Sequence, residues 1–436
     1  MKYYSTNNNN YKVSFEEAVV KGLAPDGGLF MPEFIPKLDD KFFINLENLS
    51  IQEIGFQVAK KFVNNEISNS DLKMIVEEAI NFDAPVISLD ENISILELFH
   101  GPTLAFKDFG ARFMARTLSY FLHNSNKEVN ILVATSGDTG SAVASGFYGI
   151  KGVNVFLLYP SGKVSEIQEK QLTTFDKNIT AIEIDGTFDD CQKLVKQAFV
   201  DSELNAKMKL SSANSINIAR LIPQSFYYFN AYKQLKDKSK EILFSIPSGN
   251  LGNLTAGIIA KKMGLPISKF IAATNSNSIF TEYLETGGYA PRASVKTLSN
   301  AMDVGNPSNL ARIQSIFEEH SVVVQNIASN SHDDLKTIEM IKQTHEKYNY
   351  IIEPHGAVGL LALEKYVTEI KLNNYSGVVL ETAHPAKFKE TVDKALGLDI
   401  QIPEELQKAI RKEKKSVLLS DEYSVFKEYL ITNSKA

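Results

Sequence analysis

A lysine set among apolar residues is the first feature of the sequence that could do chemistry. Lys107 lies in the segment His100–Gly110, next to Ala105, Phe106 and Phe109. Such surroundings solvate a cation poorly, and desolvation disfavours the charged form of an amine. The neutral amine is a nucleophile that can form a Schiff base with an aldehyde. The alternative is a surface lysine whose alkyl chain covers the neighbouring rings, which is common for this residue type.

A turn built from serine, glycine and asparagine is the second such feature. Ser248–Asn253 follows an apolar run at 242–246 and precedes a helical pattern. The N–H groups at the start of a helix bind anions, and Gly249 and Gly252 would let the backbone approach one closely. Neither a Walker motif nor a dinucleotide-binding glycine pattern is present. The turn therefore suits a single phosphate monoester, or it is a glycine-rich connection without a ligand.

Hydroxyl-bearing residues follow two further strand-like runs. Ser136–Gly140 comes after the run 129–134, and Thr382 comes after the run 377–381. Ligands of open α/β sheets collect at these carboxyl ends of strands. Asp138 can instead cap the next helix, and Thr382 can either donate a hydrogen bond to a neutral ring nitrogen or only pack. A reactive lysine, a phosphate-binding turn and strand-end hydroxyl groups together describe a site for pyridoxal phosphate.

With these motifs the sequence resembles the threonine synthase family, in its bacterial and fungal branch. That family belongs to the fold-type II pyridoxal-phosphate enzymes, which include the tryptophan synthase β chain. The resemblance covers essentially the whole chain, and its motifs occur in order: Ser14–Ala18 with Gly27–Phe30, His100–Thr103 through Lys107–Phe109, Ser136–Gly140, Gly249–Asn253 and Asn306–Asn309. The chain departs from many relatives at Asn7, where they carry an arginine.

The resemblance implies a role for each group of residues. Lys107 would form the Schiff base with pyridoxal 5'-phosphate and move protons. The residues implied to bind the cofactor are Lys107, Gly249, Asn250, Leu251, Gly252, Asn253 and Thr382. Those implied to hold the amino-acid carboxylate of the substrate are Ser136, Gly137, Asp138 and Thr139. The candidates for the substrate phosphate are Lys163, Ser308, Asn309 and Arg312, although a lysine or arginine can also be a plain surface residue.

The activity that the resemblance implies is conversion of O-phospho-L-homoserine and water into L-threonine and phosphate, the last step of threonine biosynthesis. It combines elimination of the γ phosphate with hydration of the β carbon. Another lyase of the same cofactor class, such as a dehydratase or a β-replacement enzyme, is an alternative because a shared fold does not fix a reaction. A silent relative that only binds a phosphorylated metabolite is a second alternative. Asn306–Asn309 favours the threonine synthase reaction, and an intact Lys107 argues against the silent relative.

The elements that must position these residues follow from the hydrophobic pattern. Residues 1–85 predict a helical N-terminal domain, with two amphipathic helices between 50 and 82. From about residue 88, apolar runs alternate with helical patterns, which is typical of βαβ units around a parallel sheet. We expect an α/β fold with two open parallel sheets: a small domain over 86–240 that carries Lys107, and a large domain over 241–436 that carries the phosphate turn and can borrow N-terminal segments.

Composition narrows the class of partner. The 436 residues include 46 basic and 52 acidic side chains, a net charge of −6 without blocks of like charge, so we expect neither nucleic acid nor membrane as a partner. A small-molecule substrate fits best, with the protein a monomer or homodimer. The single cysteine, Cys191, excludes an intramolecular disulfide framework and fits a reducing compartment.

Two further patterns concern location and metals. The N-terminal residues show no secretory signal, and no apolar run approaches the roughly 20 residues of a membrane span. We therefore expect a cytoplasmic protein. The seven histidines show no metal-ligand spacing, so we expect no catalytic metal.

Overall fold

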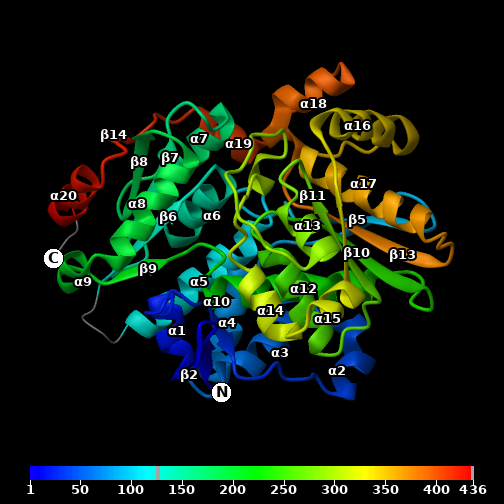
Figure 1. Cartoon of the computed structure of the whole chain (residues 1–436), viewed down its shortest axis with the longest axis horizontal. Helices are drawn as coiled ribbons and strands as arrows, with labels where there is room; N and C mark the ends of the chain where they lie inside the picture. The colour runs from blue at the N-terminus through cyan, green and yellow to red at the C-terminus, as the bar shows by residue number, and fades with distance from the viewer. Residues whose placement is uncertain (124–127, 434–436) are drawn as a thin grey trace.

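Two mainly parallel β-sheets form the scaffold of the chain, and helices pack around both (Figure 1). The computed structural model describes residues 1–123 and 128–433. The arrangement confirms the expected α/β class with two open sheets. None of the described helices is long and apolar enough to cross a membrane.

The N-terminal part combines helices with a small antiparallel sheet. Its strands pair in the order β2-β1-β3, and the elements are β1 (Tyr3–Ser5), β2 (Asn8–Val13), α1 (Phe15–Lys21), β3 (Phe30–Pro32), α2 (Asp40–Asn45), α3 (Ile51–Val63) and α4 (Asn69–Ala79). Ser50 and Glu53 form a capping box at the start of α3. The apolar faces of α3 and α4 join the main core, so the expected pair of amphipathic helices is confirmed. The polar run of asparagines in β2 gave no strand signal in the sequence.

The five-stranded sheet is parallel throughout, in the order β14-β8-β7-β6-β9. Its strands are β6 (Val129–Ala134), β7 (Val153–Pro160), β8 (Ile179–Asp185), β9 (Leu210–Ser212) and β14 (Val417–Ser420). Its helices are α6 (Asp138–Phe147), α7 (Glu166–Thr173), α8 (Phe188–Val200), α9 (Ser202–Lys207) and α20 (Tyr423–Asn433). Cys191 on α8 is free and buried, as expected.

The six-stranded sheet has the order β12-β11-β10-β13-β5-β4, and only the edge strand β4 is antiparallel. Its strands are β4 (Val86–Ser88), β5 (Ile93–Glu97), β10 (Glu241–Pro247), β11 (Lys269–Thr274), β12 (Ile327–Ser331) and β13 (Tyr375–Glu381). The helices that come after β10 in the chain, between and after the remaining strands of this sheet, are α12 (Gly252–Lys262), α13 (Ile279–Thr286), α14 (Leu310–Phe317), α15 (His320–Asn326), α16 (Asp334–Tyr348), α17 (Pro354–Glu369) and α18 (Lys389–Leu396).

Four further helices complete the described fold. They are α5 (Lys107–Leu122), α10 (Ile218–Leu221), α11 (Phe226–Gln234) and α19 (Glu404–Ile410). The first four residues of α11, Phe226–Phe229, are aromatic and buried, and Tyr227 packs edge-on against Phe109 of α5 with 5.2 Å between ring centroids. These four aromatic residues therefore belong to the core.

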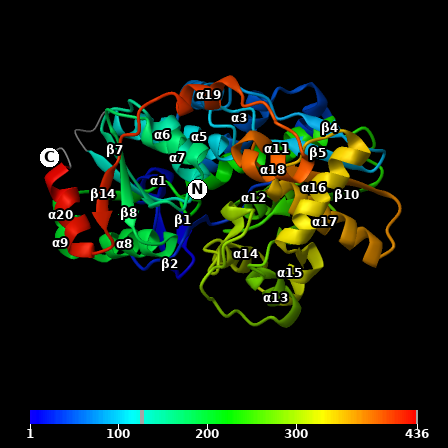
Figure 2. The same ribbon diagram turned by 90° about the horizontal axis from the view of Figure 1, so that it is seen from above.

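Sheet membership differs from the expected division of the chain at two places. Strand β5 lies within the segment 86–240, yet it pairs with β13 of the six-stranded sheet. Strand β14 lies within 241–436, yet it pairs with β8, and Figures 1 and 2 both show the C-terminal elements beside β8 and α8. Pairing between strands far apart in sequence leaves no local pattern. Domains predicted as continuous segments of the chain therefore could not include these two pairings. As a result, Lys107 lies where the chain leaves β5 and enters α5, between the two sheets.

Candidate active site

A cavity of about 570 Å³ brings together most of the residues that the sequence singled out. Strand ends and helix starts from both sheets line it. The predicted residues on its wall are Lys107, Ser136, Thr139, Gly249, Asn250, Leu251, Gly252, Asn253, Ser308 and Thr382. Five other predicted residues are absent from the wall: Gly137, Asp138, Lys163, Asn309 and Arg312.

Lys107 is the first residue of α5 and is held against the end of β13. The preceding residue, Phe106, donates its N–H to the carbonyl of Thr382 at 2.9 Å, and Leu104 adopts a left-handed conformation with φ 56°. Burial lowers the pKa of Lys107 to about 8, with Asp138 acting to raise it and Arg220 to lower it further. A substantial fraction of the amine is therefore neutral near physiological pH, as a nucleophilic lysine requires.

The turn 248–253 presents free donors at the start of α12. Leu251 is left-handed with φ 59°, and the helix begins at Gly252. The side-chain oxygen of Asn253 accepts hydrogen bonds from Tyr227 and Tyr228, each at 2.7 Å, while its buried Nδ2 has no partner. An unpartnered buried amide donor on the wall of a cavity calls for an acceptor from a ligand. A phosphate monoester fits this turn.

The glycines of that turn are needed for a reason that the sequence did not show. A Cβ atom on Gly249 would lie 2.8 Å from the carbonyl oxygen of Ala301, and one on Gly252 would lie 3.0 Å from Cβ of Ser215. We expected glycine here because of close approach to an anion. The neighbouring Ala301 already excludes a larger residue at position 249, and Ser215 leaves little room for a side chain at position 252.

Asp138 is engaged by two other side chains. Its carboxylate pairs with Nζ of Lys387 at 2.7 Å and accepts a hydrogen bond from Nε2 of Gln168 at 3.1 Å. Burial acts to raise its pKa, but Lys387 and then Lys107 outweigh this, and the net shift is downward. The residue at the N-cap of α6 is Gly137, so the alternative of Asp138 as a helix cap is wrong. Gly137 lies behind the wall, where its N–H donates to Thr135 Oγ1 at 3.0 Å.

Thr382 meets a buried carboxylate and histidine. Its hydroxyl donates to Glu353 Oε1 at 3.2 Å, and Glu353 Oε2 contacts His355 Nδ1 at 2.6 Å. His355 Nε2 accepts the N–H of Ala301 at 3.1 Å, which places the histidine proton on Nδ1. Thr382 also lines the cavity, so its hydroxyl group lies between Glu353 and any ligand bound there. That Thr382 faces the ring nitrogen of the cofactor stays a prediction.

The structure does not bring the two predicted basic residues to the cavity. Lys163 is exposed, and its Nζ donates to the carbonyl of Gly186 at 2.9 Å. Arg312 is fully buried, and its guanidinium donates to the carbonyl oxygens of Phe30, Ser215 and Ile216 and to the side chain of Asn309. Asn309 in turn donates to the carbonyl of Asn250 at 2.9 Å. Both Arg312 and Asn309 support the turn from behind.

Arg220 is a basic residue that the sequence reasoning missed. It lines the cavity although it is only 3 % exposed, and its Nε has no hydrogen-bond partner. Its Nη1 donates to the carbonyl of Ala213, and within the described part of the chain no carboxylate forms an ion pair with it. Burial lowers the pKa of Arg220 to about 10, which leaves it charged. Its position among apolar residues in 218–223 is the same signal that drew attention to Lys107.

Other residues on the wall were also missed. They come from the N-terminal part, from α8, from the 212–216 segment and from α17: Thr6, Asn7, Lys196, Asn214, Ser215 and His355. Asn7, where relatives carry an arginine, donates its side-chain amide to the carbonyl of Asp26 at 3.1 Å. Among the described residues, no group of three or more His, Cys, Asp or Glu side chains is placed to hold a metal ion.

Comparisons with known proteins agree with this geometry. Three family models match the chain: Threonine synthase N terminus over residues 2–80, Pyridoxal-phosphate dependent enzyme over 83–381, and Threonine synthase, C-terminal over 356–430. The chain is 43 % identical over 433 residues to threonine synthase of Haemophilus influenzae, covering 99 % of this chain and 100 % of the relative. It is 44 % identical over 407 residues to that of Escherichia coli K12, covering 93 % and 94 %.

Solved structures give the same result. The crystal structure of threonine synthase from Escherichia coli superposes with a TM-score of 0.93 at 42 % identity, with all of both chains covered. The crystal structure of pyridoxal-phosphate-bound threonine synthase from Brucella melitensis superposes with a TM-score of 0.92 at 35 % identity, again over both whole chains.

Proposed function

The chain belongs to the threonine synthase family of pyridoxal-phosphate enzymes, and from this premise we propose which of its residues carry out each part of the reaction. The reaction converts O-phospho-L-homoserine and water into L-threonine and phosphate, with pyridoxal 5'-phosphate as the cofactor. The observation that carries the assignment of residues is that Lys107, the turn 249–253 and Thr382 meet on the wall of one cavity.

The residues present fit the cofactor. Asn253 Nδ2 and the first N–H groups of α12 would hold its phosphate, and Lys107 would hold its aldehyde carbon covalently. Thr382 would face the ring nitrogen. When bound, the cofactor supplies an electron sink that stabilises negative charge on the substrate carbons.

Lys107 then acts as the acid and base. As a free amine, its Nζ would take the proton from the substrate α carbon and return it later. A pKa of about 8 suits an amine that must both accept and release a proton near neutral pH. Among the described residues, the cavity wall holds one other lysine, Lys196. It belongs to α8, a helix of the five-stranded sheet.

The amino-acid carboxylate of the substrate would lie at the start of α6. Ser136 and Thr139 line the cavity there, and the helix dipole favours an anion at this end. Gly137 and Asp138 lie behind them and shape the turn. We therefore assign direct contact to the two hydroxyl residues and a supporting role to the other two.

Arg220 replaces Lys163 and Arg312 as the candidate for binding the substrate phosphate. Among the described residues no carboxylate forms a direct ion pair with Arg220, and Asp108, which acts on it, is hydrogen-bonded to Thr103. A buried cation in this state is costly unless a ligand supplies the opposite charge. A phosphate leaving group supplies it, and positive charge stabilises that group as its bond to the γ carbon breaks. Ser308, Ser215 and Lys196 lie on the same wall and can donate further hydrogen bonds.

Purified protein loaded with pyridoxal phosphate tests the proposal. It should release threonine and phosphate in equal amounts from O-phospho-L-homoserine, and much less product from serine or threonine. The Arg220→Gln variant should keep the cofactor but lose most turnover. Equal rates with serine and phosphohomoserine would favour a dehydratase instead. We also propose that the enzyme acts in the cytoplasm, which its single buried cysteine supports, and that it is a monomer or homodimer.

A further inference from the structure

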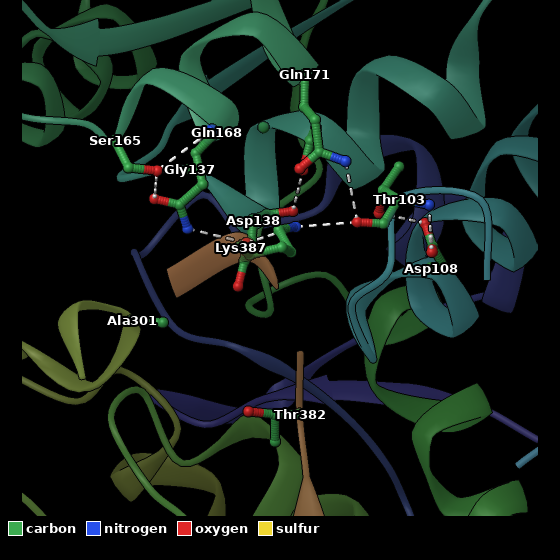
Figure 3. A network of polar contacts seen from close by, with 12 residues as sticks. Thr103, Asp108, Gly137, Asp138, Ser165, Gln168, Gln171, Ala301, Thr382 and Lys387 are labelled. Carbon is green, nitrogen blue, oxygen red and sulfur yellow. Dashed lines mark hydrogen bonds and ion pairs between the residues drawn. The ribbon is translucent and has the colours of Figure 1, made fainter. Parts of the chain in front are cut away.

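A second lysine, distant from Lys107 in sequence, lies fully buried between the two sheets. Lys387 belongs to the short 3-10 helix Pro385–Phe388 that follows β13, and it is 1 % exposed. Its Nζ forms an ion pair with Asp138 at 2.7 Å and donates to the carbonyl of Thr103 at 2.9 Å (Figure 3). A buried ammonium group that is paired and hydrogen-bonded in this way is fixed in position.

The two partners of Lys387 belong to different parts of the site. Thr103 lies in the turn that carries Lys107, and its N–H and hydroxyl donate to Asp108 at 2.9 and 2.7 Å. Asp138 opens α6, next to the proposed carboxylate site. Lys387 therefore ties the Lys107 turn and the start of α6 to the end of the six-stranded sheet.

Helix α7 closes the network from the other side. Gln168 donates to Asp138 at 3.1 Å, and Gln171 donates to the same carbonyl of Thr103 as Lys387, also at 3.1 Å. Figure 3 shows both glutamine side chains reaching from α7 toward this network. The contacts thus join segments from four places in the chain around one cation.

Charges from several elements act on Lys107. After burial, Asp138 of α6 raises its pKa, while Arg220 of α10 and Lys387 lower it. His355 of α17 acts on Asp138 rather than on Lys107. Asp108 of α5 is adjacent in sequence but is bound to Thr103. Among the described residues that act on Lys107, Asp138 is therefore the one anion, and it favours the protonated amine.

We propose that Lys387 is a positioning residue, whose ammonium group holds Asp138 and the Lys107 turn together and cancels the negative charge of Asp138 beside Lys107. The inference rests on the proposed role of Lys107 as the reactive amine. Without Lys387, the carboxylate of Asp138 would pair with a protonated Lys107 and would make it a poorer nucleophile. With Lys387 in place, the carboxylate already has its cation.

The test uses the full-length chain without cofactor. An amine-reactive acylating reagent labels only neutral amines, and mass spectrometry of the peptide that contains Lys107 gives the labelling rate against pH. In Lys387→Met the midpoint of this profile should move to higher pH, and labelling near pH 7 should slow by about tenfold for each pH unit that the midpoint rises. In Asp138→Asn the midpoint should move to lower pH. In the double variant it should lie between the two.

Two controls keep the result specific. Lys394→Met removes an exposed lysine of α18 and should leave the Lys107 profile unchanged. Lys387→Arg keeps the cation and should stay closer to the parent profile than Lys387→Met. In the cofactor-loaded protein, the pH at which the cofactor absorbance changes should shift in the same directions.

Unchanged profiles in both single variants, or shifts in the same direction, would overturn the proposal. If Lys387→Met does not melt cooperatively, the double variant Lys387→Met with Asp138→Asn is used instead, because it leaves no unpaired charge. Its labelling midpoint should lie at higher pH than that of Asp138→Asn alone, and an equal or lower midpoint would overturn the proposal. Labelling needs neither cofactor nor substrate, so its outcome is independent of turnover. The proposed function fails separately, if Lys107→Ala still makes threonine.

Discussion

The hydroxyl group of Thr382 donates a hydrogen bond to the buried carboxylate of Glu353, with 3.2 Å between Thr382 Oγ1 and Glu353 Oε1. Glu353 also accepts hydrogen bonds from the backbone N–H groups of His355 and Gly356 and contacts the ring of His355. The orientation of Thr382 at the cavity is therefore set by a carboxylate that is itself held by its own helix.

Thr382→Val should weaken cofactor binding, because an isosteric methyl group can neither accept nor donate. The loss of one hydrogen bond at a buried site is worth about 1 kcal/mol, or roughly fivefold to tenfold in the dissociation constant. Absorbance titration of the cofactor-free protein with pyridoxal phosphate measures this. Thr382→Ser keeps the oxygen and should bind as the parent does. Equal affinities for the valine and serine variants would mean that Thr382 does not contact the cofactor.

Glu381 lies beside Glu353, where its carboxyl group accepts the Glu353 N–H at 2.7 Å. We expect this buried carboxyl group to make the stability of the fold depend on pH. Burial, and then the neighbouring Glu353, raise the pKa of Glu381 well above its usual range. For a carboxyl group whose folded-state pKa is raised, the stabilising contribution is complete below the unfolded pKa of about 4.3 and is lost as pH rises toward the folded pKa. Glu381→Gln cannot ionise, so it should gain stability relative to the parent as pH rises.

The expected gain of Glu381→Gln is up to about 1.4 kcal/mol per pH unit within that window. Urea unfolding at pH 5, 6 and 7 measures it. Glu369→Gln, at the exposed end of α17, is the matched control and should show no such trend. A stability difference that stays constant across the three pH values would show that Glu381 is ionised in the folded protein.

Asn253→Asp should weaken cofactor binding strongly while keeping the hydrogen bonds from the two tyrosines. The substitution replaces the unpartnered donor Nδ2 with a negatively charged oxygen that faces the phosphate. Charge-assisted contacts are worth about twice a neutral one, so a loss of about a hundredfold in affinity is expected. Asn8→Asp adds the same charge on the exposed strand β2 and should change nothing. Unchanged affinity in Asn253→Asp would place the phosphate elsewhere.

Arg220→Gln should lower kcat/KM for phosphohomoserine by about a hundredfold or more, because a buried charge–phosphate contact is lost. Cofactor affinity should change much less. Lys163→Met removes an exposed lysine outside the cavity and should leave kcat/KM unchanged. Steady-state kinetics of the two variants separates the candidates. The reverse pattern would restore Lys163 as the residue that binds the substrate phosphate.

The sequence predicted those parts of the site that depend on local pattern. Lys107 in its apolar turn, and the glycine-rich turn before α12, were predicted because each lies within one short segment of distinctive composition. The buried strand β6 was likewise predicted over its whole length, because every residue of a central parallel strand is buried.

The remaining features depend on contacts between distant segments. Arg312 was predicted to bind the substrate phosphate, but carbonyl oxygens of Phe30 and Ile216 take up its guanidinium group. Backbone acceptors have no sequence signature, so the sequence could not show that the guanidinium group of Arg312 is already taken up by the protein. The ion pair of Asp138 with Lys387 joins the first residue of α6 to the 3-10 helix after β13, and such a distant contact leaves no local pattern either.

Locating the covalently attached cofactor tests the central claim most directly. The cofactor-loaded protein is reduced with borohydride, digested and analysed by mass spectrometry, in parallel with a threonine assay of the unreduced protein. The account predicts that the cofactor is found on the peptide containing Lys107, and that Lys107→Ala loses both the attachment and threonine formation while it still melts cooperatively. Attachment to another lysine, or near-normal threonine formation by Lys107→Ala, would contradict it.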